Sequence, residues 1–228
     1  MEMDQIKIDK IIRSRRRSLG LEVTLDARLV IRAPLRISLG DIEKLVLSKR
    51  VWIEKKQRIA REKHFKAIPQ RFLDREEFLY LGDSFPLFIV ERGDAPLAFD
   101  KGFRLMRENL PFAKQLFIDW YKKEAGKKIK ERLDWYSGLS GFKYNKFGIS
   151  NARKRWGSCS GKGSLHFSWR LIMAPLSVID YVVVHELVHL AEKNHSRRFW
   201  DRVKTIRPDY KKSKRWLKDN SHLLIIEG

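Results

Sequence analysis

The sequence predicts an α+β protein in which a small domain of strands and helices precedes a mainly helical domain. Apolar and polar residues alternate at several places in about the first hundred residues, which is the period of a half-buried strand. From about residue 111 the apolar residues recur every three or four positions, which is the period of a helix. Hydrophobic residues make up 43% of the 228, enough apolar bulk for folded cores. We therefore expect one domain over 1–108 and a second over 109–228.

The N-terminal part is expected to contain a β-hairpin followed by a helix. Alternating apolar residues over 19–25 and again over 29–31 predict the hairpin, which Pro34 closes. Apolar residues at helical spacing over 38–63 predict the helix, with Asp41 as its N-cap. The apolar stripe of this helix should pack on the sheet.

Two further β segments and a long helix should follow. Residues 76–93 and 96–109 carry apolar runs interrupted by Gly with Asp or Pro, a composition typical of strands joined by turns. The amphipathic stretch that starts near Pro111 predicts a helix that ends at the glycines of 138–141.

The next segment, residues 144–175, predicts two strands and then the start of another helix. The Ser- and Gly-rich turn 158–164 should join the strands, and Pro175 should stop the second one. A helix then follows, because Ser177 and Asp180 have the spacing of a capping box and apolar residues come after them at intervals of three and four.

This last helix carries the most informative residues of the chain. His185 and His189 are four residues apart, so their imidazoles project from one helix face, close enough to bind one ion. Glu186 directly follows the first histidine. In this His-Glu-x-x-His pattern two imidazoles bind zinc, and the carboxylate accepts a proton from a zinc-bound water.

His195 is the predicted third ligand, since a catalytic zinc usually has three protein ligands and one water. On a continuous helix it would point away from His189, because six residues rotate by about 600°. The helix must therefore end first. Asn194 tolerates the left-handed conformation that ends helices, and Ser196 can cap the next helix. The remaining histidines stand alone in the sequence and are expected to bind no metal: His64, His166 and His222.

Five segments, RWGSCS, SWRLIMAP, IDYVVVHELVHL, NHSRRFW and RPDYKKSKRWL, resemble the YgjP-like metallopeptidase family, which is related to the WLM and SprT-like zincins. The resemblance extends over essentially the whole chain. It implies a zincin-like C-terminal domain with His185, His189 and His195 as zinc ligands and Glu186 as the catalytic acid/base. One departure is Ser168, because the family usually has asparagine at this position before the tryptophan.

The predicted function is therefore that of a zinc-dependent metallopeptidase that acts on a peptide or protein substrate. Zinc would polarise the scissile carbonyl, while Glu186 takes a proton from water and passes it to the leaving amine. The oxyanion needs a further donor, for which Tyr181, Arg153 and Arg155 are candidates. Residues 156–159 are a candidate edge strand for pairing with an extended substrate.

Two other interpretations stay open, and both rest on charge. The net charge is +21, from 49 basic and 28 acidic residues, and such a field attracts polyanions. Zinc with a glutamate base could hydrolyse a nucleotide or another phosphoanhydride equally well. The third interpretation is a DNA-associated protein with an ancillary metal site. The basic run Arg13–Ser18 is either a solvated turn or strand edge, or a phosphate-binding patch.

The remaining features bear on the compartment. No segment reaches the roughly 18 apolar residues of a membrane-spanning helix, and the N-terminus lacks the apolar core of a signal peptide. The single cysteine, Cys159, allows no internal disulfide and is expected to be a small buried residue. We therefore expect a cytoplasmic protein that does not enter a membrane. The oligomeric state is left open.

Overall fold

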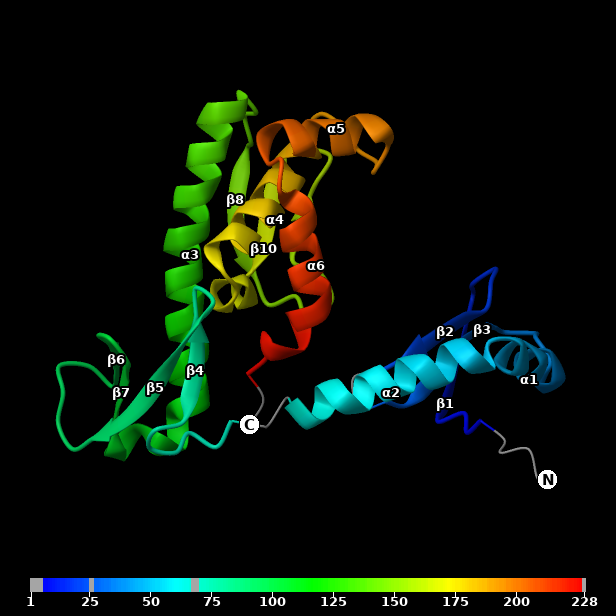
Figure 1. The fold of residues 1–228 in the computed structure, drawn as a ribbon, viewed down its shortest axis with the longest axis horizontal. Helices are drawn as coiled ribbons and strands as arrows, with labels where there is room; N and C mark the ends of the chain where they lie inside the picture. The colour runs from blue at the N-terminus through cyan, green and yellow to red at the C-terminus, as the bar shows by residue number, and fades with distance from the viewer. Residues whose placement is uncertain (1–5, 25–26, 67–69, 227–228) are drawn as a thin grey trace. The chain divides into compact units, whose positions relative to one another are not determined.

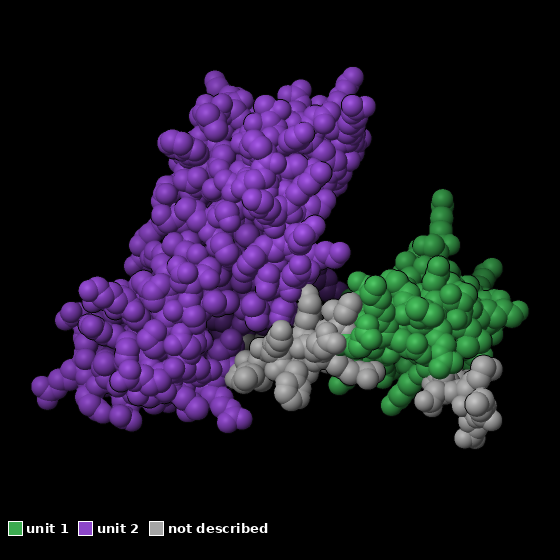
Figure 2. Space-filling model, viewed as in Figure 1, with its two compact units in different colours: residues 1–68 green, residues 69–228 purple. Residues whose placement is uncertain are grey.

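The computed structural model describes residues 6–24, 27–66 and 70–226, and the chain forms two compact units (Figures 1 and 2). The first unit covers residues 1–68 and the second covers 69–228. Strands and helices occur in both units, which confirms the predicted α+β class. The division differs from the predicted boundary near residue 108.

The first unit is a three-stranded sheet with two helices. β1 (Lys10–Ser14) runs parallel to β3 (Leu29–Pro34), and β2 (Gly20–Val23) runs antiparallel to it, in the order β1-β3-β2. β2 and β3 form the predicted hairpin, of which residues 25–26 lie outside the described part. The single predicted helix is divided at Lys49 into α1 (Leu39–Ser48) and α2 (Arg50–Lys66).

The predicted N-cap of α1 is wrong by three residues. The Ser38 hydroxyl oxygen accepts the backbone N–H of Asp41 at 3.1 Å, and the hydroxyl donates to the Asp41 carboxylate at 2.6 Å. Ser38 is therefore the cap, and Asp41 is the acidic partner within the first turn. Six buried residues from β3 and the two helices form the core of this unit: Leu29, Ile31, Ala33, Ile42, Val46 and Ile53.

The first arginine of the basic run has a structural role. The Arg13 guanidinium donates to the backbone carbonyls of Pro34 at 3.2 Å, Leu35 at 3.1 Å and Ile37 at 2.8 Å. These bonds hold the connection between β3 and α1. Arg13 lies in β1 at an edge of the sheet, so at this residue the strand-edge interpretation is favoured over a phosphate-binding patch.

The second unit begins with a four-stranded sheet in the order β4-β5-β7-β6. The strands are β4 (Glu77–Tyr80), β5 (Asp83–Val90), β6 (Leu97–Phe99) and β7 (Phe103–Met106). Both predicted β segments are thus confirmed. Short 3-10 helices elsewhere in this unit are η1 (Arg107–Phe112), η2 (Trp169–Met173) and η3 (Ser221–Leu223).

This sheet belongs to the second unit because it shares a core with α3 (Ala113–Ser140). The ring of Phe78 stacks on Phe117 of α3 with 4.2 Å between centroids. The Tyr121 hydroxyl on the same helix donates to the Leu79 carbonyl at 2.7 Å. Since these contacts join the sheet and the helix, the division falls at residue 68 and not at 108. As predicted, α3 ends at a glycine: Gly141 has a left-handed φ of 73°.

A second sheet contains three strands where two were predicted. β8 (Lys146–Ser150) runs parallel to β10 (Ser164–Ser168), and β9 (Gly157–Cys159) runs antiparallel to it. The order β8-β10-β9 places β9 at an edge. The last helices are α4 (Leu176–Val188), α5 (Arg197–Ile206) and α6 (Tyr210–Asn220). α4 contacts α3, α5, α6 and β9, so it occupies the centre of the unit (Figure 1).

The predicted capping box of α4 is wrong, because Asp180 has other partners. α4 begins after Pro175, and no side chain caps it. The buried Asp180 carboxylate accepts from Arg132 of α3 at 2.6 and 3.1 Å and from Arg207 at 3.2 Å. The Ser177 backbone carbonyl also accepts from Arg207, at 3.2 Å. Asp180 therefore connects α4 to α3 and to the end of α5.

Membrane crossing would require a long apolar helix. In the described part of the chain, no helix combines the necessary length with the necessary apolar character.

Candidate metal centre

The three predicted ligand residues converge. His185 and His189 lie at the end of α4, and His195 precedes α5. One ligand nitrogen from each lies within 4.8 Å of the others, and the Nε2 atoms of His185 and His195 are 3.0 Å apart. Two nitrogens on one tetrahedral zinc at the usual bond length are roughly 3.3 Å apart, so this separation suits a shared cation.

The chain reverses between the second and third histidines, as predicted, but the local chemistry differs. α4 ends at Val188, whose carbonyl accepts the Glu192 backbone N–H at 2.9 Å. Asn194 does not adopt the predicted left-handed conformation. Its side-chain oxygen instead accepts the Ser196 backbone N–H at 3.2 Å. The prediction for Ser196 is confirmed, because its hydroxyl caps α5 by accepting the Phe199 N–H.

Two features orient the imidazoles. Nδ1 of His189 lies 3.0 Å from the Glu192 carbonyl oxygen. A carbonyl only accepts, so Nδ1 carries the proton and the Nε2 lone pair is left for a metal. The Phe199 ring supports the cluster, because its centroid lies 4.6 to 4.8 Å from all three imidazole centroids.

Burial keeps the α4 imidazoles neutral. Burial, with smaller contributions from the neighbouring histidines and Lys214, lowers the pKa of His185 to about 3. The pKa of His189 is also lowered, mainly by burial. A neutral imidazole has the free lone pair that metal binding requires, so these two side chains need to lose no proton at neutral pH.

The Glu186 carboxylate is buried against the edge strand. Its residue is 6% exposed, and burial raises its pKa to about 7, against a smaller lowering by Arg155. A Cβ on Gly157 of β9 would lie only 2.5 Å from the Glu186 side chain. Gly157 thus leaves the space that the carboxylate occupies. Sequence reasoning missed this residue, although a glycine inside a strand is a signal of close approach.

Aromatic rings from α4, α5 and α6 stack next to the histidine cluster, and the sequence did not predict this arrangement. Trp200 of α5 stacks on His195 with 5.7 Å between centroids and on Tyr210 of α6 with 5.4 Å. Tyr210 in turn stacks on Tyr181 at 6.3 Å. α6 therefore contributes to the environment of the histidine cluster.

The three candidate oxyanion donors differ in position. Tyr181 is buried, its ring lies 5.9 Å from that of His185, and burial raises its pKa to about 12, so it keeps a donor proton at neutral pH. Arg155 acts electrostatically on Glu186. Arg153 acts instead on the buried Arg170. Tyr181 and Arg155 are thus placed near the histidine cluster, and no contact shows this for Arg153.

Other residues considered from the sequence lie outside the cluster. In the described part of the chain, His166 and His222 do not join it, and the His64 side chain is not described. Cys159 is half-buried, and burial raises the pKa of its thiol, which does not favour a nucleophile. The buried Ser168 hydroxyl donates to the Ala152 carbonyl at 2.8 Å and so has a structural role.

Known proteins similar to this chain include one solved structure. The crystal structure of the metallopeptidase zymogen of Pyrococcus abyssi abylysin matches with a TM-score of 0.36 and 22% sequence identity, and the match covers 40% of this chain and 92% of that one. No curated protein matches the chain. The family model described as "YgjP-like, metallopeptidase domain" matches residues 17–220. With nearly the whole chain matched, the protein belongs to the YgjP-like metallopeptidase family.

Proposed function

We propose that the protein is a zinc-dependent metallopeptidase in which His185, His189 and His195 bind the metal and Glu186 is the catalytic acid/base. The observation that carries this proposal is the convergence of three imidazoles beside a buried carboxylate. Membership of a metallopeptidase family supports the choice of peptide substrates.

The donor set fits zinc. Three neutral nitrogen ligands that leave one position open are typical of catalytic zinc sites, and imidazole suits this ion. The His189 hydrogen bond to a backbone carbonyl is the usual support for such a ligand. When bound, zinc would supply a Lewis acid that polarises the scissile carbonyl and acidifies water.

Glu186 performs the proton transfers. A carboxylate with a pKa of about 7 can accept a proton from the attacking water and then donate it to the leaving amine nitrogen. Tyr181, which stays protonated, is the proposed donor to the developing oxyanion, together with the charge of Arg155. Among the described strands β9 pairs with β10 alone, so its other edge can bind an extended peptide.

A phosphoanhydride hydrolase is the second candidate, because cations border the centre. Arg155 acts on Glu186, Lys193 on His189 and Lys214 on His185. These charges would also attract a nucleotide.

One experiment separates the candidates. Purified protein is expected to bind about one zinc per chain and to cleave an unfolded protein, and a chelator should abolish cleavage until zinc is restored. A nucleotide panel and single-stranded DNA are the parallel substrates. Cleavage of nucleotides alone would reject the peptidase assignment. Tight DNA binding that is independent of zinc, without hydrolysis of any substrate, would favour the DNA-associated alternative.

Gly157→Ala should reduce peptide hydrolysis at least tenfold while zinc binding is retained. The added methyl group would take the space of the Glu186 side chain and displace the carboxylate, and small misplacements of a catalytic group are costly. Steady-state kinetics with zinc analysis measure this. Gly161→Ala is the matched control, because nothing lies within 4 Å of its Cβ position. Equal activities of the two variants would contradict the proposed position of Glu186.

A further inference from the structure

The cations around the centre come from three separate segments. Arg155 lies two residues before Gly157, which contacts Glu186. Lys193 lies in the turn between His189 and His195. Lys214 is on α6 and acts electrostatically on His185. The centre is therefore influenced by positive charges from three separate segments of the chain.

Lys214 is held in place, unlike most surface lysines. Its Nζ lies 4.0 Å from the Trp200 ring centroid, whereas the other lysine–aromatic pairs in the described residues are 5.9 Å apart. Trp200 is itself fixed, because its ring stacks on Tyr210 at 18° and on His195 at 23°. An ammonium over an indole is favourable, so the charge has a defined position beside the third histidine.

Among the described residues, the Lys214 ammonium has no carboxylate partner. Glu192, the acidic residue of this turn, pairs with Arg202 at 3.3 Å. Asp209, next to α6, pairs with Arg207 at 3.6 Å. In the described part of the chain, no carboxylate lies within ion-pair distance of Lys214. A bound metal would add further positive charge, so the site has an excess that an anionic group of the substrate can offset.

We propose that Lys214 is a specificity-determining residue that binds an acidic side chain of the substrate beside the scissile bond. The site then prefers acidic peptides. An extended peptide places its side chains alternately on two faces, so an acidic residue next to the cleaved bond can face α6 while the backbone pairs with β9. This inference rests on the proposed peptidase function.

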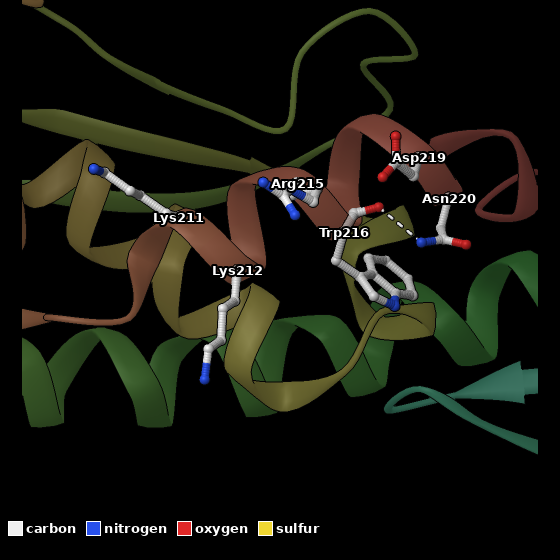
Figure 3. A pocket seen from close by; sticks show the side chains of 6 residues that line it. All are labelled: Lys211, Lys212, Arg215, Trp216, Asp219 and Asn220. Atoms are coloured by element: carbon white, nitrogen blue, oxygen red, sulfur yellow. Dashed lines mark hydrogen bonds between the residues drawn. The ribbon is translucent and has the colours of Figure 1, made fainter.

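The other cations of α6 provide a control. Lys211, Lys212 and Arg215 project from α6 and line a cavity of about 390 Å³ together with Trp216, Asp219 and Asn220 (Figure 3). None of the three clustered histidines lines this cavity. Lys212→Met thus removes the same charge from the same helix without removing the ammonium that lies over Trp200.

The test uses zinc-loaded full-length protein and peptide pairs that differ by Glu or Gln beside the cleaved bond. The wild type should favour the Glu peptide by roughly fivefold in kcat/KM, the size expected for one partly exposed ion pair. Lys214→Met should abolish this preference through KM, with kcat retained. Lys214→Arg should keep the preference, and Lys214→Glu should favour a Lys peptide. Lys212→Met should behave as the wild type does.

Two results would overturn the inference, and they are distinguishable. If the wild type cleaves both peptides but Lys214→Met slows both equally, Lys214 has only a structural role. If the wild type binds zinc but cleaves neither peptide, the proposed function fails and the peptide preference fails with it. If the protein hydrolyses nucleotides in that second case, the cations around the centre would be inferred to bind the phosphates of a substrate.

Discussion

Glu186→Gln should keep its zinc and lose peptide hydrolysis by about three orders of magnitude. The amide has nearly the same shape as the carboxylate and fits the space beside Gly157, but it cannot accept a proton from water. Removal of a general base typically costs a factor of about 10² to 10⁴. Zinc content and kcat/KM on an unfolded protein measure the two properties independently.

The control for this variant is Glu131→Gln on α3. Glu131 is exposed and pairs with Lys128 of the same helix, so its loss should leave hydrolysis unchanged. If Glu186→Gln with a full complement of zinc were as active as Glu131→Gln, another residue would have to be the base.

The same variant should also change the pH dependence of stability when metal is removed. Burial raises the pKa of Glu186 from 4.5 to about 7, so the folded state binds the proton more tightly than the unfolded state. Stability is therefore lost as the pH rises through this window. Glu186→Gln avoids this loss and should be more stable than the wild type at pH 8, by up to about 3 kcal/mol, with little difference near pH 4. Urea unfolding with a chelator at both pH values tests this, and a pH-independent difference would contradict it.

Asp180→Ala is expected to have the largest effect on stability, a loss of about 3 to 5 kcal/mol. Asp180 is 4% exposed, and its carboxylate pairs with both Arg132 and Arg207. Its removal leaves the Arg132 guanidinium without this anion and leaves Arg207 with the more distant, half-exposed Asp209 at 3.6 Å, which is costly for two largely buried charges. Urea unfolding at constant zinc concentration measures the change.

Asp201→Ala provides the comparison. Asp201 lies 3.8 Å from Arg197 on the surface of α5, with both side chains mostly exposed, and such pairs contribute at most about 1 kcal/mol. A loss in Asp180→Ala no larger than that in Asp201→Ala would show that the buried carboxylate does not stabilise the packing of α3, α4 and α5.

The approach of the three histidines could be predicted because it depends on local geometry. The four-residue spacing of His185 and His189 places both on one helix face, and the Ser196 cap depends on a hydroxyl and a backbone N–H three residues apart. The glycine that ends α3 and the alternating burial along β3 could be predicted for the same reason, because both depend on residues close together in the sequence.

What could not be predicted depends on partners that are distant in the sequence. Ser177 and Asp180 have the spacing of a capping box, but the Asp180 carboxylate pairs instead with an arginine 48 residues away, Arg132. The predicted boundary near residue 108 differs from the division into compact units at residue 68, because the change from strand to helix does not reveal that Phe78 packs on Phe117. Gly157 and Glu186 are adjacent only because β9 lies against α4.

The close spacing of the histidines also has a kinetic consequence. His185 and His195 are only ten positions apart in the sequence, so an ion bound by both would close a short loop, which costs little chain entropy and can form within about 100 nanoseconds. Capture of the ion therefore need not wait for the distant strands to assemble. A bound ion would connect the end of α4 to the start of α5 early in folding. Loss of the ion should therefore destabilise this short segment before the rest of the chain unfolds.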